Sequence, residues 1–142
     1  MKNIRTLPKY VFDSLFKDLD FSSYKKTCFI SILDLDNDEN KWNKSDNFLQ
    51  VRMWDVDKTV SKYELPNDLE LKKIVDFINL NKDKDNFIIH CSAGISRSGA
   101  VALFIHDKFI DCIDKDKFRR ENNQILPNLY ILNKLKEFDI NI

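Results

Sequence analysis

The segment IIHCSAGISRSGA, residues 88–100, differs in composition from the rest of the chain. The chain has two glycines, Gly94 and Gly99, and both lie in this segment. The three alanines lie in it or just after it, whereas the remaining sequence is rich in Lys, Asn, Asp, Ile, Leu and Phe. Small residues allow a backbone to fold closely around a bound group. Their concentration around Cys91 and Arg97 therefore indicates a binding loop.

Patterns of a buried strand and of a helix flank this loop. Residues 86–90 (NFIIH) have the apolar character of a buried strand, and residues 97–113 (RSGAVALFIHDKFIDCI) form an apolar helical pattern. A loop that opens a helix directs several backbone N–H groups at one point, where the helix dipole adds positive charge. We therefore expect the loop to bind a tetrahedral oxyanion.

Two side chains make this loop chemically reactive. Arg97, six residues after Cys91, can fold over the loop and bind two oxygens of an anion bidentately. The positive field also stabilises a thiolate, so we expect the pKa of Cys91 to fall well below its usual value of about 8.5. The loop is thus suited to a sulfur nucleophile that attacks a phosphoryl group.

Strand and helix patterns alternate along the rest of the chain. Further strands are expected at 3–6, 27–33 and 48–54, a surface loop at 34–47, and helices at 9–19, 67–80 and 128–138. Pro8 is expected in the first turn of the first helix, and Asn128 as the cap of the last one. Four residues are expected on one apolar face of that last helix: Leu129, Leu132, Leu135 and Phe138. The order predicts an α/β fold with a central, mostly parallel sheet flanked by helices, and the loop at its ligand-binding edge.

Composition excludes several classes of protein. The 142 residues carry 23 basic and 23 acidic side chains, so no net field favours nucleic acid or an anionic membrane. The N-terminal sequence has no apolar run typical of a signal peptide, and no segment approaches a membrane span. Three cysteines without metal-ligand spacing favour free thiols, with Cys28 and Cys112 packed in the core. We expect one cytoplasmic domain, residues 1–142; the oligomeric state stays open.

The loop also resembles a known family. HCSAGISRS (90–98) matches the H-C-x-x-G-x-x-R-[ST] phosphate loop of the protein tyrosine phosphatases. Residues 4–16, 29–33 and 51–56 resemble the first strand, first helix and acid-loop approach of small bacterial and phage-type phosphatases. Residues 119–135 (RRENNQILPNLYILNKL) resemble the closing helix of dual-specificity phosphatases. The resemblance covers most of the chain in order and implies a compact phosphatase of the dual-specificity type.

This resemblance implies a two-step reaction. Cys91 attacks phosphorus to form a phosphocysteine, and an aspartic acid protonates the leaving oxygen and then activates water. Ser98 is expected to hydrogen-bond the sulfur, and His90 to orient the loop from behind. The phosphate would be bound by the side chain of Arg97 and the amides of Ser92, Ala93, Gly94, Ile95, Ser96, Arg97 and Ser98. No metal or other cofactor is expected, because these groups supply the positive charge.

Two aspartates compete for the role of general acid. Both lie in VRMWDVD (51–57), ahead of the phosphate loop. In the dual-specificity pattern the acid directly follows an apolar, alternating strand, which favours Asp55. Asp57 lies two residues further on and remains the alternative.

The predicted function is hydrolysis of phosphate monoesters on phosphoproteins, at phosphotyrosine and also at phosphoserine or phosphothreonine. The expected partner is a phosphorylated protein or peptide, with no nucleic acid or membrane. Three alternatives stay open. A phosphoinositide phosphatase would favour Lys in the loop, an RNA 5′-triphosphatase would favour a basic groove, and a phosphotyrosine-binding pseudophosphatase would lack the Cys, the Arg or the acid.

Overall fold

A sheet of four strands forms the centre of the computed structural model, which describes residues 1–39, 45–58 and 63–140. Every neighbouring pair of these strands is parallel. Their spatial order is β1 (Asn3–Pro8), β4 (Asn86–Cys91), β2 (Thr27–Leu33) and β3 (Phe48–Arg52). The predicted α/β class with a central parallel sheet is confirmed. Part of the loop expected at 34–47 lies outside the described residues.

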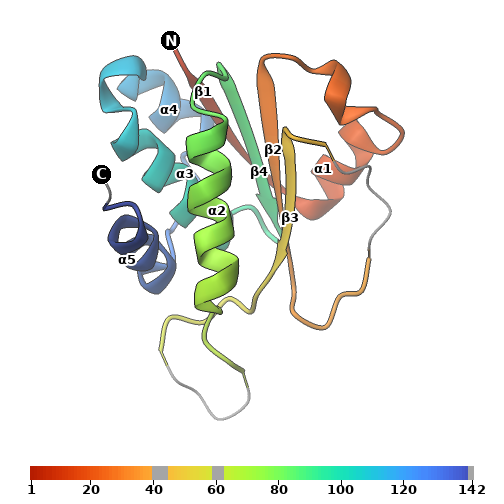
Figure 1. Ribbon diagram of the computed structural model, residues 1–142, viewed down its shortest axis with the longest axis vertical. Coiled ribbons are helices and arrows are strands. Elements are labelled where there is room, and N and C mark those ends of the chain that lie inside the picture. Colours follow the sequence, from red (N-terminus) through yellow and green to blue (C-terminus); the bar gives the residue numbers. More distant parts are fainter. Residues whose placement is uncertain (40–44, 59–62, 141–142) are drawn as a thin grey trace.

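Helices cover the two faces of the sheet unequally (Figure 1). One face carries α1 (Lys9–Phe16) and a short 3₁₀ turn at Phe21–Ser23. The other face carries α2 (Asp68–Leu80), α3 (Arg97–Lys108), α4 (Lys115–Glu121) and α5 (Leu129–Phe138). Within the described parts of the chain, no helix is long and apolar enough to cross a membrane.

Aromatic rings fill the thinner layer, between the sheet and α1. Its buried cluster is Leu7, Phe12, Phe21, Phe29 and Phe48. The rings of Phe21 and Phe29 meet edge to face at 4.7 Å, and those of Phe21 and Phe48 stack at 4.6 Å. Such pairs add about 0.5–1.5 kcal/mol each beyond area burial. This layer holds α1 behind the carboxyl end of β4.

The thicker layer follows the helical period of the sequence. The face of α2 formed by Leu71, Ile74, Val75 and Ile78 is buried, and the Asn67 side chain caps this helix by accepting from Leu69 N at 2.7 Å. Ala100 and Val101 of α3 are fully buried, so this helix packs tightly below the loop that precedes it. The sheet and α3 together give the loop a rigid base.

Several local predictions were wrong. Pro8 ends β1 and stands as the N-cap of α1, with ψ 157°, so it lies outside the first helical turn. Helix α4 was missed, and the helix after the loop stops at Lys108 before a separate 3₁₀ turn. Leu129 is 61% exposed, because Ile131, Leu132 and Leu135 form the buried face of α5 and the first residue of the helix lies off that face. Cys112 is exposed in that 3₁₀ turn, whereas Cys28 is buried as expected.

Candidate active site

The segment between Cys91 and Arg97 connects the end of β4 to the start of α3. Gly94 has φ 72°, in the left-handed region that favours glycine. A Cβ at this position would lie 2.6 Å from the carbonyl carbon of Leu7 and from the nitrogen of Pro8. The end of β1 therefore passes directly behind the loop, which explains why the tightest point of the curve carries a glycine.

The Cys91 sulfur lies at the base of this loop, in a residue that is only 2% exposed. Burial by itself would raise the pKa of the thiol. Hydrogen bonds from the Ser98 side chain and from the backbone N–H groups of Ser98 and Ile95, together with the charge of Arg97, outweigh burial and lower the pKa. The Sγ–Ser98 Oγ distance is 3.2 Å. The site thus favours a thiolate.

Arg97 is held over the loop by three acceptors. Nη1 donates to the Met53 carbonyl oxygen at 2.7 Å and lies 2.9 Å from Asp34 Oδ1, while Nη2 donates to Ser92 Oγ at 3.0 Å. The residue is 4% exposed, and its Nε is buried with no hydrogen-bond partner among the residues that the structure describes. A buried guanidinium N–H without an acceptor is costly, so this atom indicates a place for an anion.

Asp34 is a site residue that sequence reasoning missed. It directly follows β2, and the carboxyl ends of β2 and β4 meet at one edge because the two strands are parallel neighbours. Its carboxylate contacts Arg97 and lies 3.5 Å from Ser92 Oγ. The signal that could have found it is an acidic residue immediately after a buried strand of a parallel sheet.

The two candidate acids differ in what they contact. Asp55 Oδ1 accepts hydrogen bonds from Ser96 Oγ at 2.8 Å and from Asn128 Nδ2 at 2.9 Å. Asp57 is exposed and makes no hydrogen bond or ion pair with the residues the structure describes. The structure thus brings Asp55 against the phosphate loop and leaves Asp57 in solvent.

His90 lies behind the loop, on the side of α1. The residue is fully buried, its ring is 4.3 Å from that of Phe12, and its Nε2 lies 2.7 Å from Ser31 Oγ. Burial lowers the pKa of His90 to about 4, so the ring is neutral at neutral pH. This position is consistent with the expected role of His90, which is to support the loop from behind without contacting the reacting atoms.

A second group of residues missed by the sequence analysis is the segment 122–128, which we call the strap. Gln124 Nε2 donates to the Gly94 carbonyl at 3.1 Å, Leu126 N to the Ile95 carbonyl at 3.0 Å, and Asn128 N to the Ser96 carbonyl at 3.0 Å. The strap therefore satisfies three successive carbonyl groups of the loop. Because these carbonyl oxygens point toward the strap, the N–H groups of the same peptide units can point toward the anion-binding side of the loop.

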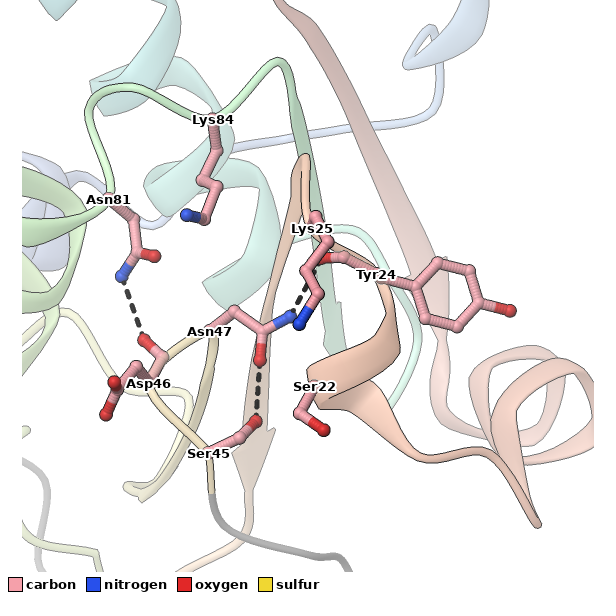
Figure 2. Close-up of a pocket in the computed structure, with 8 residues that line it drawn as sticks. All are labelled: Ser22, Tyr24, Lys25, Ser45, Asp46, Asn47, Asn81 and Lys84. Atoms are coloured by element: carbon pink, nitrogen blue, oxygen red, sulfur yellow. Dashed lines mark hydrogen bonds between the residues drawn. The ribbon is translucent and has the colours of Figure 1, made fainter.

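A polar hollow of about 350 Å³ lies at the opposite end of the sheet (Figure 2). It is lined by Ser22, Tyr24, Lys25, Ser45, Asp46, Asn47, Asn81 and Lys84, several of which immediately precede β2, β3 or β4. At about 3.3 Å per residue, β4 places Cys91 roughly 20 Å away. The Asn47 side chain is already bonded to Ser45 and to backbone carbonyls. This hollow is separate from the site.

At the carboxyl edge of the sheet, one small loop thus brings together the Cys91 thiolate, the Arg97 guanidinium and the Asp55 carboxyl group. Backbone amides at the start of α3 add partial positive charge. These groups can bind a tetrahedral anion, attack its central atom with sulfur, and exchange a proton with one of its oxygens.

Comparison with known proteins identifies a matching family and similar folds. The sequence model of the family described as "Protein-tyrosine phosphatase" matches residues 9–125. No curated protein matches the chain. Among solved structures, the human tyrosine phosphatase-like serine/threonine/tyrosine-interacting protein is similar with TM-score 0.53 and 18% identity, covering 89% of this chain and 85% of that one. DUSP15 gives TM-score 0.51 and 19% identity, covering 97% of this chain and 83% of that one.

A third similar structure is a leucine rich repeat and phosphatase domain containing protein from Entamoeba histolytica. Its TM-score is 0.50 and its identity 13%, with 98% of this chain and 87% of that one covered. At such identities these likenesses establish the fold. They match the predicted compact α/β architecture.

Proposed function

The chain belongs to the protein-tyrosine phosphatase family, and from this premise we propose that it hydrolyses phosphate monoesters on phosphoproteins through a phosphocysteine intermediate. The proposed substrates carry phosphotyrosine, and also phosphoserine or phosphothreonine. The observation that carries the proposal is the arrangement of Cys91 and Arg97 around one loop. A thiol with a lowered pKa and a buried guanidinium Nε, which has no partner within the described part of the chain, occur at the same loop.

In the first proposed step, the Cys91 thiolate forms an S–P bond as the P–O bond to the leaving group breaks. Asp55 gives its proton to the leaving oxygen, so the alcohol or phenol departs neutral. In the second step, the Asp55 carboxylate takes a proton from a water whose oxygen attacks phosphorus. The S–P bond breaks, phosphate leaves, and the Ser98 side chain hydrogen-bonds the returning thiolate. Arg97 and the loop amides hold the equatorial oxygens throughout.

Loop charge supports phosphoproteins over polyphosphorylated substrates. The side chains between Cys91 and Arg97 are neutral, and the nearby Asp34 carboxylate adds negative charge beside the loop. A phosphoinositide or an RNA 5′-triphosphate would bring further phosphates against this carboxylate, and residues 92–96 of the loop carry no cationic side chain to meet them. A cytoplasmic location fits this chemistry, because the mechanism needs a reduced thiol.

The test is turnover of p-nitrophenyl phosphate by the purified protein. We expect steady hydrolysis that needs no added metal and is abolished by Cys91→Ser, which keeps the shape but removes the thiolate. A matched variant, Cys112→Ser, removes an exposed thiol outside the site and should keep full activity. Lack of hydrolysis by the folded wild type would favour a phosphotyrosine-binding protein instead.

A further inference from the structure

Asn128 does more than begin the last helix. Its Oδ1 accepts from Ile131 N at 3.0 Å, which is the expected cap of α5. Its Nδ2 donates to Asp55 Oδ1 at 2.9 Å and to the Val56 carbonyl at 3.0 Å. The two ends of one amide therefore serve different partners, a helix on one side and the segment of the candidate acid on the other.

The Asn128 amide is itself held firmly. The residue is 5% exposed, and its backbone N–H donates to the Ser96 carbonyl at 3.0 Å. Ser96 in turn donates its hydroxyl to Asp55 Oδ1 at 2.8 Å. The three residues thus form a closed set of hydrogen bonds that links the phosphate loop, the strap and the segment after β3.

Asp55 needs such support because of where it lies. It is exposed and follows the end of β3 without regular secondary structure of its own. An exposed aspartate samples several side-chain rotamers, and a proton donor must stay within hydrogen-bond reach of the leaving oxygen. Two donors on one carboxyl oxygen, from a buried amide and from the loop, select one orientation.

We propose that Asn128 is a positioning residue for Asp55, which fixes Oδ1 so that Oδ2 carries the transferred proton. The inference rests on the proposed function, in which Asp55 is the general acid. An amide N–H can donate both to the carbonyl oxygen of the protonated acid and, more strongly, to a carboxylate oxygen. The orientation therefore persists when Asp55 changes from acid to base between the two steps.

The proton balance follows from this assignment. In the first step the proton on Oδ2 moves to the leaving oxygen as the P–O bond breaks, and Asp55 becomes a carboxylate. In the second step Oδ2 receives a proton from the attacking water, and the acid is restored. Oδ1 keeps its two hydrogen bonds in both steps.

The two roles of Asn128 can be separated by Asn128→Ser. Serine is a good N-cap and keeps an acceptor for the first turn of α5, but it is too short to take the place of Nδ2 at Asp55. The matched control is Asn67→Ser, the same change at the cap of α2, whose amide oxygen accepts from Leu69 N. Any loss that comes from weaker capping alone should appear in both variants.

The measurement is kcat/KM for phenyl phosphate divided by kcat/KM for p-nitrophenyl phosphate, because kcat/KM reports the steps up to departure of the leaving group and not the common hydrolysis of the phosphocysteine. Phenol is the poorer leaving group and needs the acid more, and the ratio does not depend on how much of a variant is folded. We expect Asp55→Asn to lower the ratio by roughly 10²-fold, within the usual range for a general acid. Asn128→Ser should lower it about tenfold, and Asn67→Ser should leave it unchanged. In the Asp55→Asn background, Asn128→Ser should cause no further fall, because the two act together.

Two results would overturn the inference, and they are distinguishable. If Asp55→Asn lowers the ratio and Asn128→Ser does not, the proposed function stands and Asn128 is only a helix cap. If Asp55→Asn itself leaves the ratio unchanged, the acid has been assigned wrongly, and the inference about Asn128 falls with it.

Discussion

Arg97 and Asp34 form an ion pair at the edge of the phosphate loop, with 2.9 Å between Nη1 and Oδ1. The same Nη1 also donates to the Met53 carbonyl, so this side of the guanidinium is fully occupied by protein acceptors. The buried Nε is the side left for an anion. Asp34 therefore acts on the orientation of Arg97, although it lies 63 positions earlier in the chain.

Replacing Asp34 should separate the hydrogen bond from the charge. Asp34→Asn keeps an oxygen acceptor for Nη1, and we expect kcat/KM for p-nitrophenyl phosphate within about threefold of wild type. Asp34→Ala removes the acceptor, and a lost charge-assisted hydrogen bond of about 1.5 kcal/mol corresponds to roughly a tenfold fall. Steady-state kinetics of both variants provides the check. Equal activity in the alanine variant and the wild type would show that Met53 and Ser92 hold Arg97 without help.

The lowered pKa of Cys91 predicts that this thiol reacts at a lower pH than ordinary thiols do. The thiolate is the form that iodoacetate alkylates, so the alkylation rate should rise with pH and reach its midpoint below that of an ordinary cysteine. Ser98→Ala removes one hydrogen bond to the sulfur and should move the midpoint upward. Alkylation of the Cys91 peptide, followed by mass spectrometry across pH, measures both. A wild-type midpoint at or above the ordinary value would contradict the proposed electrostatics of the loop.

The choice between Asp55 and Asp57 has a direct kinetic test. Of these two aspartates, only Asp55 has a hydrogen bond to the phosphate loop among the residues that the structure describes, through Ser96. Asp55→Asn should lower kcat/KM strongly for an alkyl phosphate and much less for an activated aryl ester, whose leaving group departs without a proton. The matched variant Asp57→Asn should leave both unchanged. If the leaving-group dependence follows Asp57 instead, the contact seen at Asp55 is not the catalytic one.

His90 should make the fold less stable in mild acid. Burial holds its pKa at about 4, against 6.5 for an unperturbed histidine, so between these values the unfolded chain binds more protons than the folded one. Stability is therefore lost as pH falls from about 6.5 to about 4, and the loss attributable to His90 is about 2 kcal/mol between pH 7 and pH 5. Urea unfolding at both pH values should show a smaller difference for His90→Asn. An equal difference in variant and wild type would mean that folding leaves the pKa of His90 unchanged.

A helix or strand could be predicted where its pattern of apolar and polar residues fits only one kind of element. Residues 27–33 were predicted as a strand from their continuous apolar run. β2 has the same bounds, and every one of its residues is buried. Helix α4 was missed because its seven residues, KDKFRRE, are mostly charged and show no apolar period. It begins instead at a polar cap, where Asp114 accepts from Lys117 N. Caps of this kind are common in loops, so they predict a helix poorly by themselves.

The residues of the site likewise fall into those that the sequence could predict and those that it could not. Cys91 and Arg97 belong to one short loop, and local sequence was enough to bring them together. Asp34 and Asn128 reach that loop from distant segments, and their contacts depend on strand order and on the path of the strap. Sequence patterns specify an element and its buried face but carry no record of which elements become neighbours. Asn128 shows the consequence, since its cap was predicted and its contact with Asp55 was not.

The most direct test of the central claim is to trap the covalent intermediate. Rapid acid quenching during turnover of p-nitrophenyl phosphate, followed by peptide mass spectrometry, should find one phosphoryl group on Cys91. Asp55→Asn should increase its amount, because the aryl group leaves without help whereas attack by water needs the base. Turnover by a wild-type enzyme that carries no phosphoryl group on Cys91, or carries it on another residue, would contradict the account.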